Sequence, residues 1–156
     1  IWFSIQLQNQ TEILCFEYTV EQKKYRLASI SKRLNKQHHT DQVFFIPTKT
    51  KWKGQETKAS YQLSWKIIIP REKISLSVSP LLKKQEMIFG TMNYWEGPIR
   101  VEGKIHHKIV SGLGFLEIVG RPSQNTKIKF LKDSLIHSSI KLYLQAKKLP
   151  KLFYDR

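Results

Sequence analysis

The segment NYWEGPIRVEG, residues 93–103, holds the side chains best suited to chemistry in this sequence. Successive residues of an extended strand point to opposite faces, so Tyr94 and Glu96 share one face and Trp95 takes the other. If the face of Tyr94 and Glu96 lines an apolar cavity, desolvation favours the neutral, protonated form of the carboxyl group. A protonated acid beside a phenol is suited to donate a proton to an alkene or to a leaving group. If that face is exposed, Glu96 is a surface charge that pairs with a lysine, and spacing alone favours this interpretation.

Other kinds of site find little support. The adjacent pairs His38–His39 and His106–His107 lie in predicted turns, and neighbours in an extended chain point apart, so each pair offers at most one metal ligand. The single cysteine, Cys15, is expected to be a small buried hydrophobic residue. The sequence has no glycine-rich phosphate loop and no serine-nucleophile motif. We therefore predict neither a metal site nor a cofactor.

The elements that must position these residues are predicted to be strands. Polar and apolar residues alternate with a period of two in YQLSWKIII, residues 61–69, and in KISLSVS, residues 73–79. Further strands are expected over residues 2–7, 12–20, 25–33, 39–47, 92–103 and 109–120. Gly112 and Gly114 share one face of the last strand, where glycine indicates a sharp bend or the close approach of another backbone. Strand following strand without helices predicts an all-β domain over residues 1–120, an antiparallel barrel or sandwich.

Residues 121–156 form a separate basic tail. They hold nine Lys/Arg against two Asp/Glu, in a chain whose formal net charge is +15. Ile136, Ile140 and Leu144 follow a helical period, which predicts a short basic helix; packing on the barrel and partial disorder are the alternatives. Such a helix is suited to bind an anionic membrane surface. Because the chain begins directly in a predicted strand, we expect it to be part of a longer protein.

The positive charge also raises the question of nucleic-acid binding. A basic balance favours anionic partners, either nucleic acid or a membrane surface. A barrel that binds single strands presents aromatic and basic side chains on the same exposed face. Here the aromatic residues mostly fall on the apolar side of their strands and the lysines on the other side. Nucleic-acid binding is therefore disfavoured, and a solvated lysine-rich surface is the simpler interpretation.

Several segments, in their order along the chain, resemble a known family. They are WFSIQLQNQTEILCF, SWKIIIP, ISLSVSPLLKKQEM, YWEGPIRVEG and VSGLGFLEIVG. Over residues 1–120 the sequence is similar to the C-terminal half of the AttH/CrtC-like family, which comprises lipocalin-like carotenoid 1,2-hydratases and relatives described as secreted hydrolases. The most specific matches are Trp2-Phe3, Gln85-Glu86, the segment 94–97 and the closing segment 112–120.

The resemblance implies a lipocalin-like β-barrel, preceded by another lipocalin-like domain in the full-length protein. It implies an apolar, isoprenoid or lipid-like ligand and an exported, periplasmic or membrane-associated location. It also implies cofactor-free hydratase (lyase) or hydrolase activity, which we expect only in the complete protein, so this chain alone is predicted to be inactive.

The predicted site residues follow from both lines of reasoning. Tyr94 and Glu96 are the predicted catalytic and ligand-binding pair, and the resemblance supports the pocket-facing orientation that spacing alone did not favour. Gln6 is a further ligand-binding candidate, because its face of the first strand is semi-polar. The alternative function is a non-catalytic lipid-binding or interdomain structural module, in which Glu96 is structural. The second alternative is the basic nucleic-acid-binding barrel.

Overall fold

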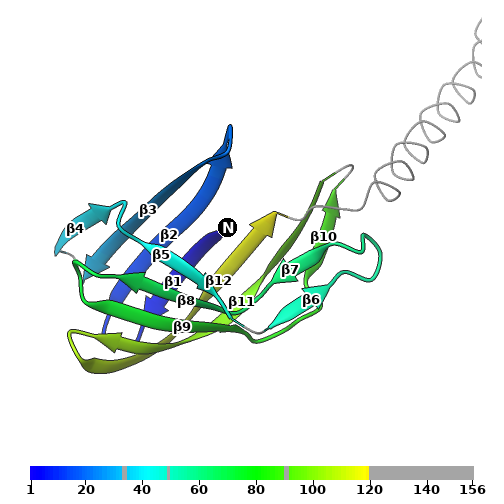
Figure 1. Ribbon diagram of the computed structural model, residues 1–156. Helices are drawn as coiled ribbons and strands as arrows, with labels where there is room; N and C mark the ends of the chain where they lie inside the picture. Colours follow the sequence, from blue (N-terminus) through cyan, green and yellow to red (C-terminus); the bar gives the residue numbers. More distant parts are fainter. Residues whose placement is uncertain (33–34, 49, 90–91, 120–156) are drawn as a thin grey trace, which may run out of the picture.

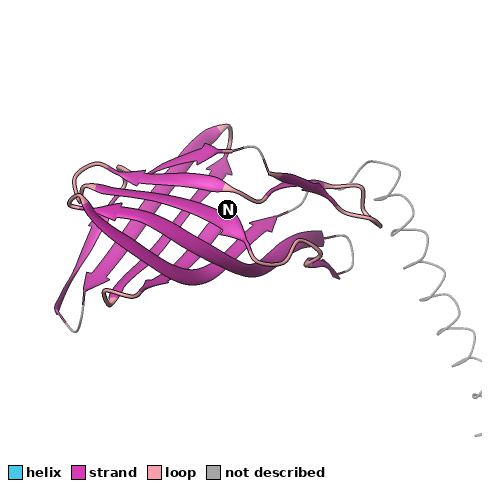
Figure 2. Ribbon diagram, turned by 90° about the horizontal axis from the view of Figure 1, so that it is seen from below, coloured by secondary structure: helices cyan, strands magenta, loops and turns pink. Residues whose placement is uncertain are grey.

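The chain is antiparallel and all-β in a computed structural model that describes residues 1–32, 35–48, 50–89 and 92–119. Within these ranges the chain consists of strands and loops, and no helix is long and apolar enough to cross a membrane (Figure 2). The strands are β1 (Trp2–Leu7), β2 (Thr11–Val20), β3 (Lys23–Lys32), β4 (Asn35–Thr40), β5 (Phe44–Pro47), β6 (Lys51–Lys53), β7 (Ser60–Gln62), β8 (Trp65–Ile69), β9 (Ile74–Pro80), β10 (Glu86–Phe89), β11 (Met92–Ile105) and β12 (Lys108–Val119).

Most of these strands belong to one strongly curved sheet (Figure 1). Its order is β4-β3-β2-β1-β12-β11-β9-β8-β5, β10 adds to β11, and β6 pairs with β7 in a separate two-stranded sheet. The edge strands β4 and β5 are not paired with each other, so the barrel is open. The predicted all-β, lipocalin-like fold is confirmed, whereas closure of the barrel is not observed. The predicted C-terminal helix lies outside the described residues.

Two predicted strands are each divided in the structure. Residues 39–47, expected to form one strand, are split between β4, which pairs with β3, and β5, which pairs with β8. Between the two, the Val43 backbone N–H donates to the Asp41 carbonyl at 2.9 Å, and the Val43 side chain is buried. This turn redirects the chain, so that the two halves of the predicted strand lie at opposite edges of the sheet.

The second divided strand is residues 61–69. It is interrupted at Leu63 and Ser64: the Leu63 backbone N–H still donates to the Thr50 carbonyl at 3.0 Å, in continuation of the β6–β7 pairing, before β8 begins at Trp65. Strand β7 thus pairs with β6, while β8 pairs with β5 and β9. The predicted apolar face is nevertheless correct, since Tyr61, Leu63, Ile67 and Ile69 are all fully buried. Strands β6 and β10 were not predicted.

The core fills the concave side of the curved sheet. Phe3 of β1 stacks on Phe45 of β5, with ring centroids 5.5 Å apart, and meets Trp65 of β8 edge-on at 6.4 Å. These contacts join strands that are far apart in the sheet, across the side where the edges do not pair. The largest fully buried side chains are Trp95, Tyr61, Phe3, Ile5, Ile13, Leu63, Ile67, Ile69, Leu76, Ile99, Leu116 and Val43. Cys15 is buried among them, as predicted.

The glycines of β12 permit the close approach that the sequence predicts. A Cβ atom added at Gly112 would lie 2.1 Å from the Gln6 carbonyl oxygen, and one at Gly114 would lie 2.1 Å from the Ser4 carbonyl oxygen. Both positions therefore require the absence of a side chain where β12 pairs with β1.

Candidate functional site

The predicted pair Tyr94 and Glu96 lies on the outer face of β11. Trp95 and Ile99 are fully buried on the opposite face, whereas Tyr94 is half-buried and Glu96 is exposed. This division of the faces confirms the predicted alternation. In the strand pairing, Glu96 stands opposite Glu117 of β12, and it forms no ion pair with a lysine of the described residues. Glu96 is exposed on this face and lacks the burial that the predicted acid role requires, so the catalytic assignment remains a prediction.

Gln6 lies in a different part of the same outer surface. It is exposed and borders an open hollow of about 550 Å³, together with residues that include Arg100, Glu102 and Leu113. The cross-strand row that holds Gln6 passes through Leu113 and Arg100, whereas the row that holds Glu96 passes through Glu117. The two rows are four residues apart on β12, which is roughly 14 Å at about 3.4 Å per residue. The structure therefore does not bring Gln6 together with Tyr94 and Glu96.

A buried polar cluster, which the sequence analysis did not identify, lies where β7, β10 and β11 meet (Figure 1). Its centre is the Tyr61 hydroxyl, which donates to Glu86 Oε1 at 2.8 Å. Asn93 Nδ2 donates to the same hydroxyl at 2.5 Å. The Thr57 hydroxyl donates to Glu86 Oε1 as well, and accepts the Ala59 backbone N–H at 3.1 Å. The side-chain hydrogen bonds of the cluster thus join the β6–β7 hairpin to β10 and β11.

The hydrogen-bond chain determines how the Asn93 amide is oriented. A neutral tyrosine has one proton, and burial, together with the hydrogen bond to the Glu86 carboxylate, raises the pKa of Tyr61. Because that proton is directed to Glu86, the Tyr61 oxygen accepts from the Asn93 NH₂ group. Asn93 Oδ1 then points elsewhere, and this buried atom meets no hydrogen-bond donor among the described residues. The cluster therefore contains one unfilled acceptor.

Local sequence features explain why the cluster forms here. Gly54 closes the β6–β7 loop by donating its N–H to the Ala59 carbonyl at 2.8 Å. The Glu86 carboxylate lies directly over Gly54, where a Cβ atom would overlap both carboxyl oxygens. Strand β10 brings Glu86 into register with the buried Trp95. An adjacent opening of about 140 Å³ is lined by Trp52, Gln55, Glu56, Lys84, Glu86 and Ile88, so Glu86 borders both the cluster and the surface.

One signal in the sequence could have revealed this cluster. Asn93 has the same strand phase as Trp95, which the alternation already placed toward the core. A buried asparagine requires polar partners. The alternation places Tyr61 on an apolar face but does not say which group its hydroxyl contacts, and Glu86 belongs to no alternating segment. Tyr61 lies on β7, 25 residues before Glu86 and 32 before Asn93, so spacing does not reveal its contact with them.

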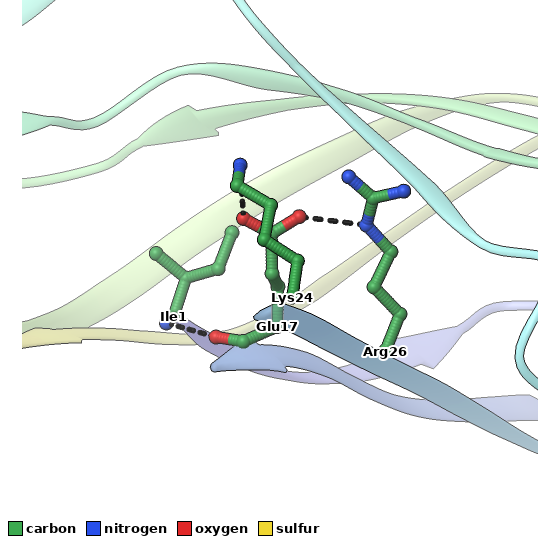
Figure 3. A network of polar contacts seen from close by, with 4 residues as sticks. All are labelled: Ile1, Glu17, Lys24 and Arg26. Atoms are coloured by element: carbon green, nitrogen blue, oxygen red, sulfur yellow. Dashed lines mark hydrogen bonds and ion pairs between the residues drawn. The ribbon is translucent and has the colours of Figure 1, made fainter. Parts of the chain in front are cut away.

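A second polar network joins β2 and β3 (Figure 3). The Glu17 carboxylate accepts from Arg26 Nε at 2.7 Å and from Lys24 Nζ at 2.9 Å. Partial burial opposes ionisation, but the hydrogen bonds from Arg26 and Lys24 prevail and lower the pKa of Glu17. The Arg26 guanidinium lies 6.0 Å from the centre of the Phe44 ring on β5. This network therefore links β3 to β5 across the open side of the barrel.

The histidine pairs differ in their placement. His106 and His107 form the turn between β11 and β12, as predicted, with positive φ angles of 46° and 67°. His38 and His39 instead lie in β4, so the turn predicted there is wrong; cross-strand pairing with β3 holds them extended. Within the part of the chain that the structure describes, no group of three or more His, Cys, Asp or Glu side chains is arranged to hold a metal ion.

Comparisons with known proteins agree on the fold. A family model described as AttH-like matches residues 1–121. No curated protein matches the sequence. The crystal structure of kievitone hydratase from Nectria haematococca superposes with a TM-score of 0.66 at 23% identity, covering 78% of this chain and 39% of that protein. The crystal structure of an AttH protein from Nitrosomonas europaea gives a TM-score of 0.59 at 20% identity, covering 73% of this chain and 36% of that protein. The chain thus spans about two fifths of each of these proteins.

Proposed function

The chain belongs to the AttH-like family, and from that premise we propose that it is the second lipocalin-like half of a longer protein and binds an apolar, isoprenoid or lipid-like ligand. The observation that carries this proposal is the apolar concave face beside an unpaired barrel edge. Phe45 and Trp65 are only partly buried there and pack on Phe3. Aromatic and aliphatic walls with few polar groups are typical of sites for apolar ligands.

We extend the proposal to the complete protein. One structural neighbour is a kievitone hydratase, which supports addition of water as the reaction class of the whole protein. That the addition is cofactor-free and acts on a carbon–carbon double bond is what the family resemblance implies. In the complete protein that contains this chain, Tyr94 and Glu96 act as the acid pair only when another domain covers the outer face of β11. An isolated chain with an exposed Glu96 is expected to be inactive. The alternative, a non-catalytic lipid-binding or interdomain module, retains the apolar site and assigns Glu96 no chemistry.

The outer face of β12 offers a surface against which the covering domain can pack. Leu113, Phe115 and Val119 project from the outer face of β12, and each is more than half exposed. Exposed apolar side chains of this kind, here with Glu117 between Phe115 and Val119, mark interaction surfaces. The two solved neighbours are more than twice as long as the part that this chain covers, which supports a preceding lipocalin-like domain as the occupant.

Ligand binding is tested with the 156-residue chain and farnesol, an isoprenoid alcohol, by quenching of tryptophan fluorescence. We expect saturable quenching that Phe45→Ala weakens, since its ring lines the concave face beside Phe3. The matched control is Phe44→Ala, because Phe44 is the neighbouring residue of β5 and its side chain is exposed. Absence of saturable binding, or equal weakening by both substitutions, contradicts the proposal. Steeply salt-dependent binding of a labelled oligonucleotide would instead support the basic nucleic-acid-binding alternative.

A further inference from the structure

The Arg26 guanidinium on β3 uses one of its nitrogens in the polar network with Glu17. Figure 3 shows that this contact runs through Nε, which donates to Glu17 Oε2 at 2.7 Å. Among the described residues, Nη1 and Nη2 of Arg26 have no hydrogen-bond or ion-pair partner. The side chain is 31% exposed, so these two nitrogens can be reached from solvent. Their N–H groups are therefore available to a ligand.

Two contacts hold the Arg26 guanidinium in one orientation. Its Nε–H is directed at Glu17, and its central carbon lies 6.0 Å from the centre of the Phe44 ring on β5. A guanidinium fixed in this way presents its remaining N–H groups as a planar fork, which matches the two oxygens of a carboxylate. Because the fork is already oriented, little side-chain freedom is lost when such a group binds.

The charges of the network favour an anionic ligand. The single negative charge of Glu17 meets the two positive charges of Arg26 and Lys24, so one positive charge is in excess. Partial burial of Arg26 and Glu17 reduces screening by water and salt. The attraction between the Arg26 fork and an anion is therefore stronger than at a fully exposed arginine.

The network lies at one end of the apolar concave face. Arg26 and Glu17 stand opposite each other on β3 and β2, and Cys15, on the same side of β2 as Glu17, is fully buried. Cys15 pairs in turn with Phe3 of β1, which stacks on Phe45. Arg26 is thus offset from Phe3 by two residues along the strands and two strand spacings across them, about 7 Å and about 10 Å. A long-chain lipid can span this distance.

The open side of the barrel gives access to the same region. Strand β5 is an edge of the sheet, and Phe45 is only partly buried there. The contact between Arg26 and Phe44 crosses this open side, so the guanidinium and the apolar face border the same gap between the sheet edges. A few polar groups beside an apolar surface are the usual means of orienting a largely apolar ligand.

We propose that Arg26 is a headgroup site that binds the carboxylate of an isoprenoid or other long-chain acid. The carboxylate accepts from Nη1 and Nη2 while Nε stays with Glu17, and the apolar stem lies along Phe45 toward Phe3. The added negative charge offsets the excess positive charge of Arg26 and Lys24. This site rests on the proposed function, because the stem occupies the same apolar face. It selects acids over esters and alcohols of the same chain.

The test compares farnesoic acid with its methyl ester on the 156-residue chain, by quenching of tryptophan fluorescence at neutral pH, where the acid is ionised. The loss of a hydrogen bond to a charged group corresponds to an affinity difference of about tenfold or more, so the acid is expected to bind at least about tenfold more tightly. Arg26→Gln is expected to abolish this preference and to leave the affinity for the ester unchanged. Arg26→Lys should retain only part of it, because an ammonium group does not reproduce the planar fork.

Arg100→Gln is the matched control. Arg100 is exposed on β11, and its substitution removes the same charge from a chain whose formal net charge is +15, so the preference for the acid is expected to remain. Equal loss of the preference in Arg26→Gln and Arg100→Gln would assign it to overall charge and overturn the site. Phe45→Ala is expected to weaken acid and ester alike, since the stem lies on its ring.

The remaining outcomes separate this site from the proposed function. Equal affinity of the unsubstituted chain for acid and ester overturns the headgroup site and leaves apolar-ligand binding intact. Acid binding that Phe45→Ala leaves unchanged places the ligand elsewhere and overturns the site as well. Binding of neither probe overturns the proposed function and the site together. If Arg26→Gln fails to fold, Arg26→Lys decides, because it keeps a positive charge beside Glu17; an undiminished preference in that variant overturns the site.

Discussion

Tyr61→Phe tests the buried polar cluster most directly, because it deletes the central hydroxyl and leaves the buried ring in place. The hydroxyl donates to Glu86 at 2.8 Å and accepts from Asn93 at 2.5 Å. A hydrogen bond to a charged group contributes about 1.5–3 kcal/mol, and a neutral one about 0.5–1.5 kcal/mol. Since Glu86 is partly exposed and keeps the hydroxyl of Thr57, the lower end of the first range applies. We expect the free energy of unfolding to fall by about 2–3 kcal/mol in total.

Urea unfolding followed by tryptophan fluorescence measures this loss. Trp95 is a suitable reporter, because it is fully buried and its indole N–H donates to the Lys83 carbonyl at 2.7 Å. The control Tyr25→Phe removes an exposed hydroxyl and is expected to change the stability by less than about 0.5 kcal/mol. A double-mutant cycle with Glu86→Gln should give a coupling of about 1 kcal/mol. Equal losses in Tyr61→Phe and Tyr25→Phe, or no coupling to Glu86, would refute the described hydrogen-bond chain.

Three further predictions concern the rest of the sheet. Gly112→Ala should lower the free energy of unfolding by about 3 kcal/mol or more, since the added Cβ meets backbone atoms of β1. In Gly97→Ala the added Cβ meets only side-chain atoms, at 2.9–3.2 Å, so the loss should be about 1 kcal/mol. Equal thermal midpoints of the two variants, measured by circular dichroism, would contradict this. Burial raises the pKa of the Cys15 thiol, so a maleimide should label it only in urea; rapid labelling of the folded chain would show that the site opens readily. Arg26 and Lys24 lower the pKa of Glu17 below its ordinary 4.5, so the stability they confer is complete above pH 4.5 and lost as the pH falls through the lowered value. The difference in urea midpoint between the unsubstituted chain and Glu17→Gln should therefore be smaller at about pH 3 than at about pH 7, and an unchanged difference would contradict it.

Local alternation determined the face of each residue well. The period of two correctly separated Trp95 and Ile99 from Tyr94 and Glu96, and it placed Tyr61 toward the core. These predictions succeeded because a strand reverses its side chains at every residue, whatever it pairs with. The ordered motifs also identified the family, which the match over residues 1–121 confirms.

Alternation did not predict where strands end or with which strands they pair. Alternation continues through Leu63, yet the backbone there leaves one sheet and enters another. Similarly, residues 39–47 read as one strand but supply both edges of the open sheet. Such breaks depend on which backbone groups the chain meets after folding, and those partners are distant in the sequence.

The sequence alone therefore determined the strand faces, the family and the close backbone approach at Gly112. Only the tertiary structure decided that Glu96 is exposed and that Tyr61, Glu86 and Asn93 meet. The physical reason is that periodicity tells which side of its own strand a side chain occupies. Whether that side is covered, and by which polar partners, depends on how distant strands are paired and how far the sheet curls.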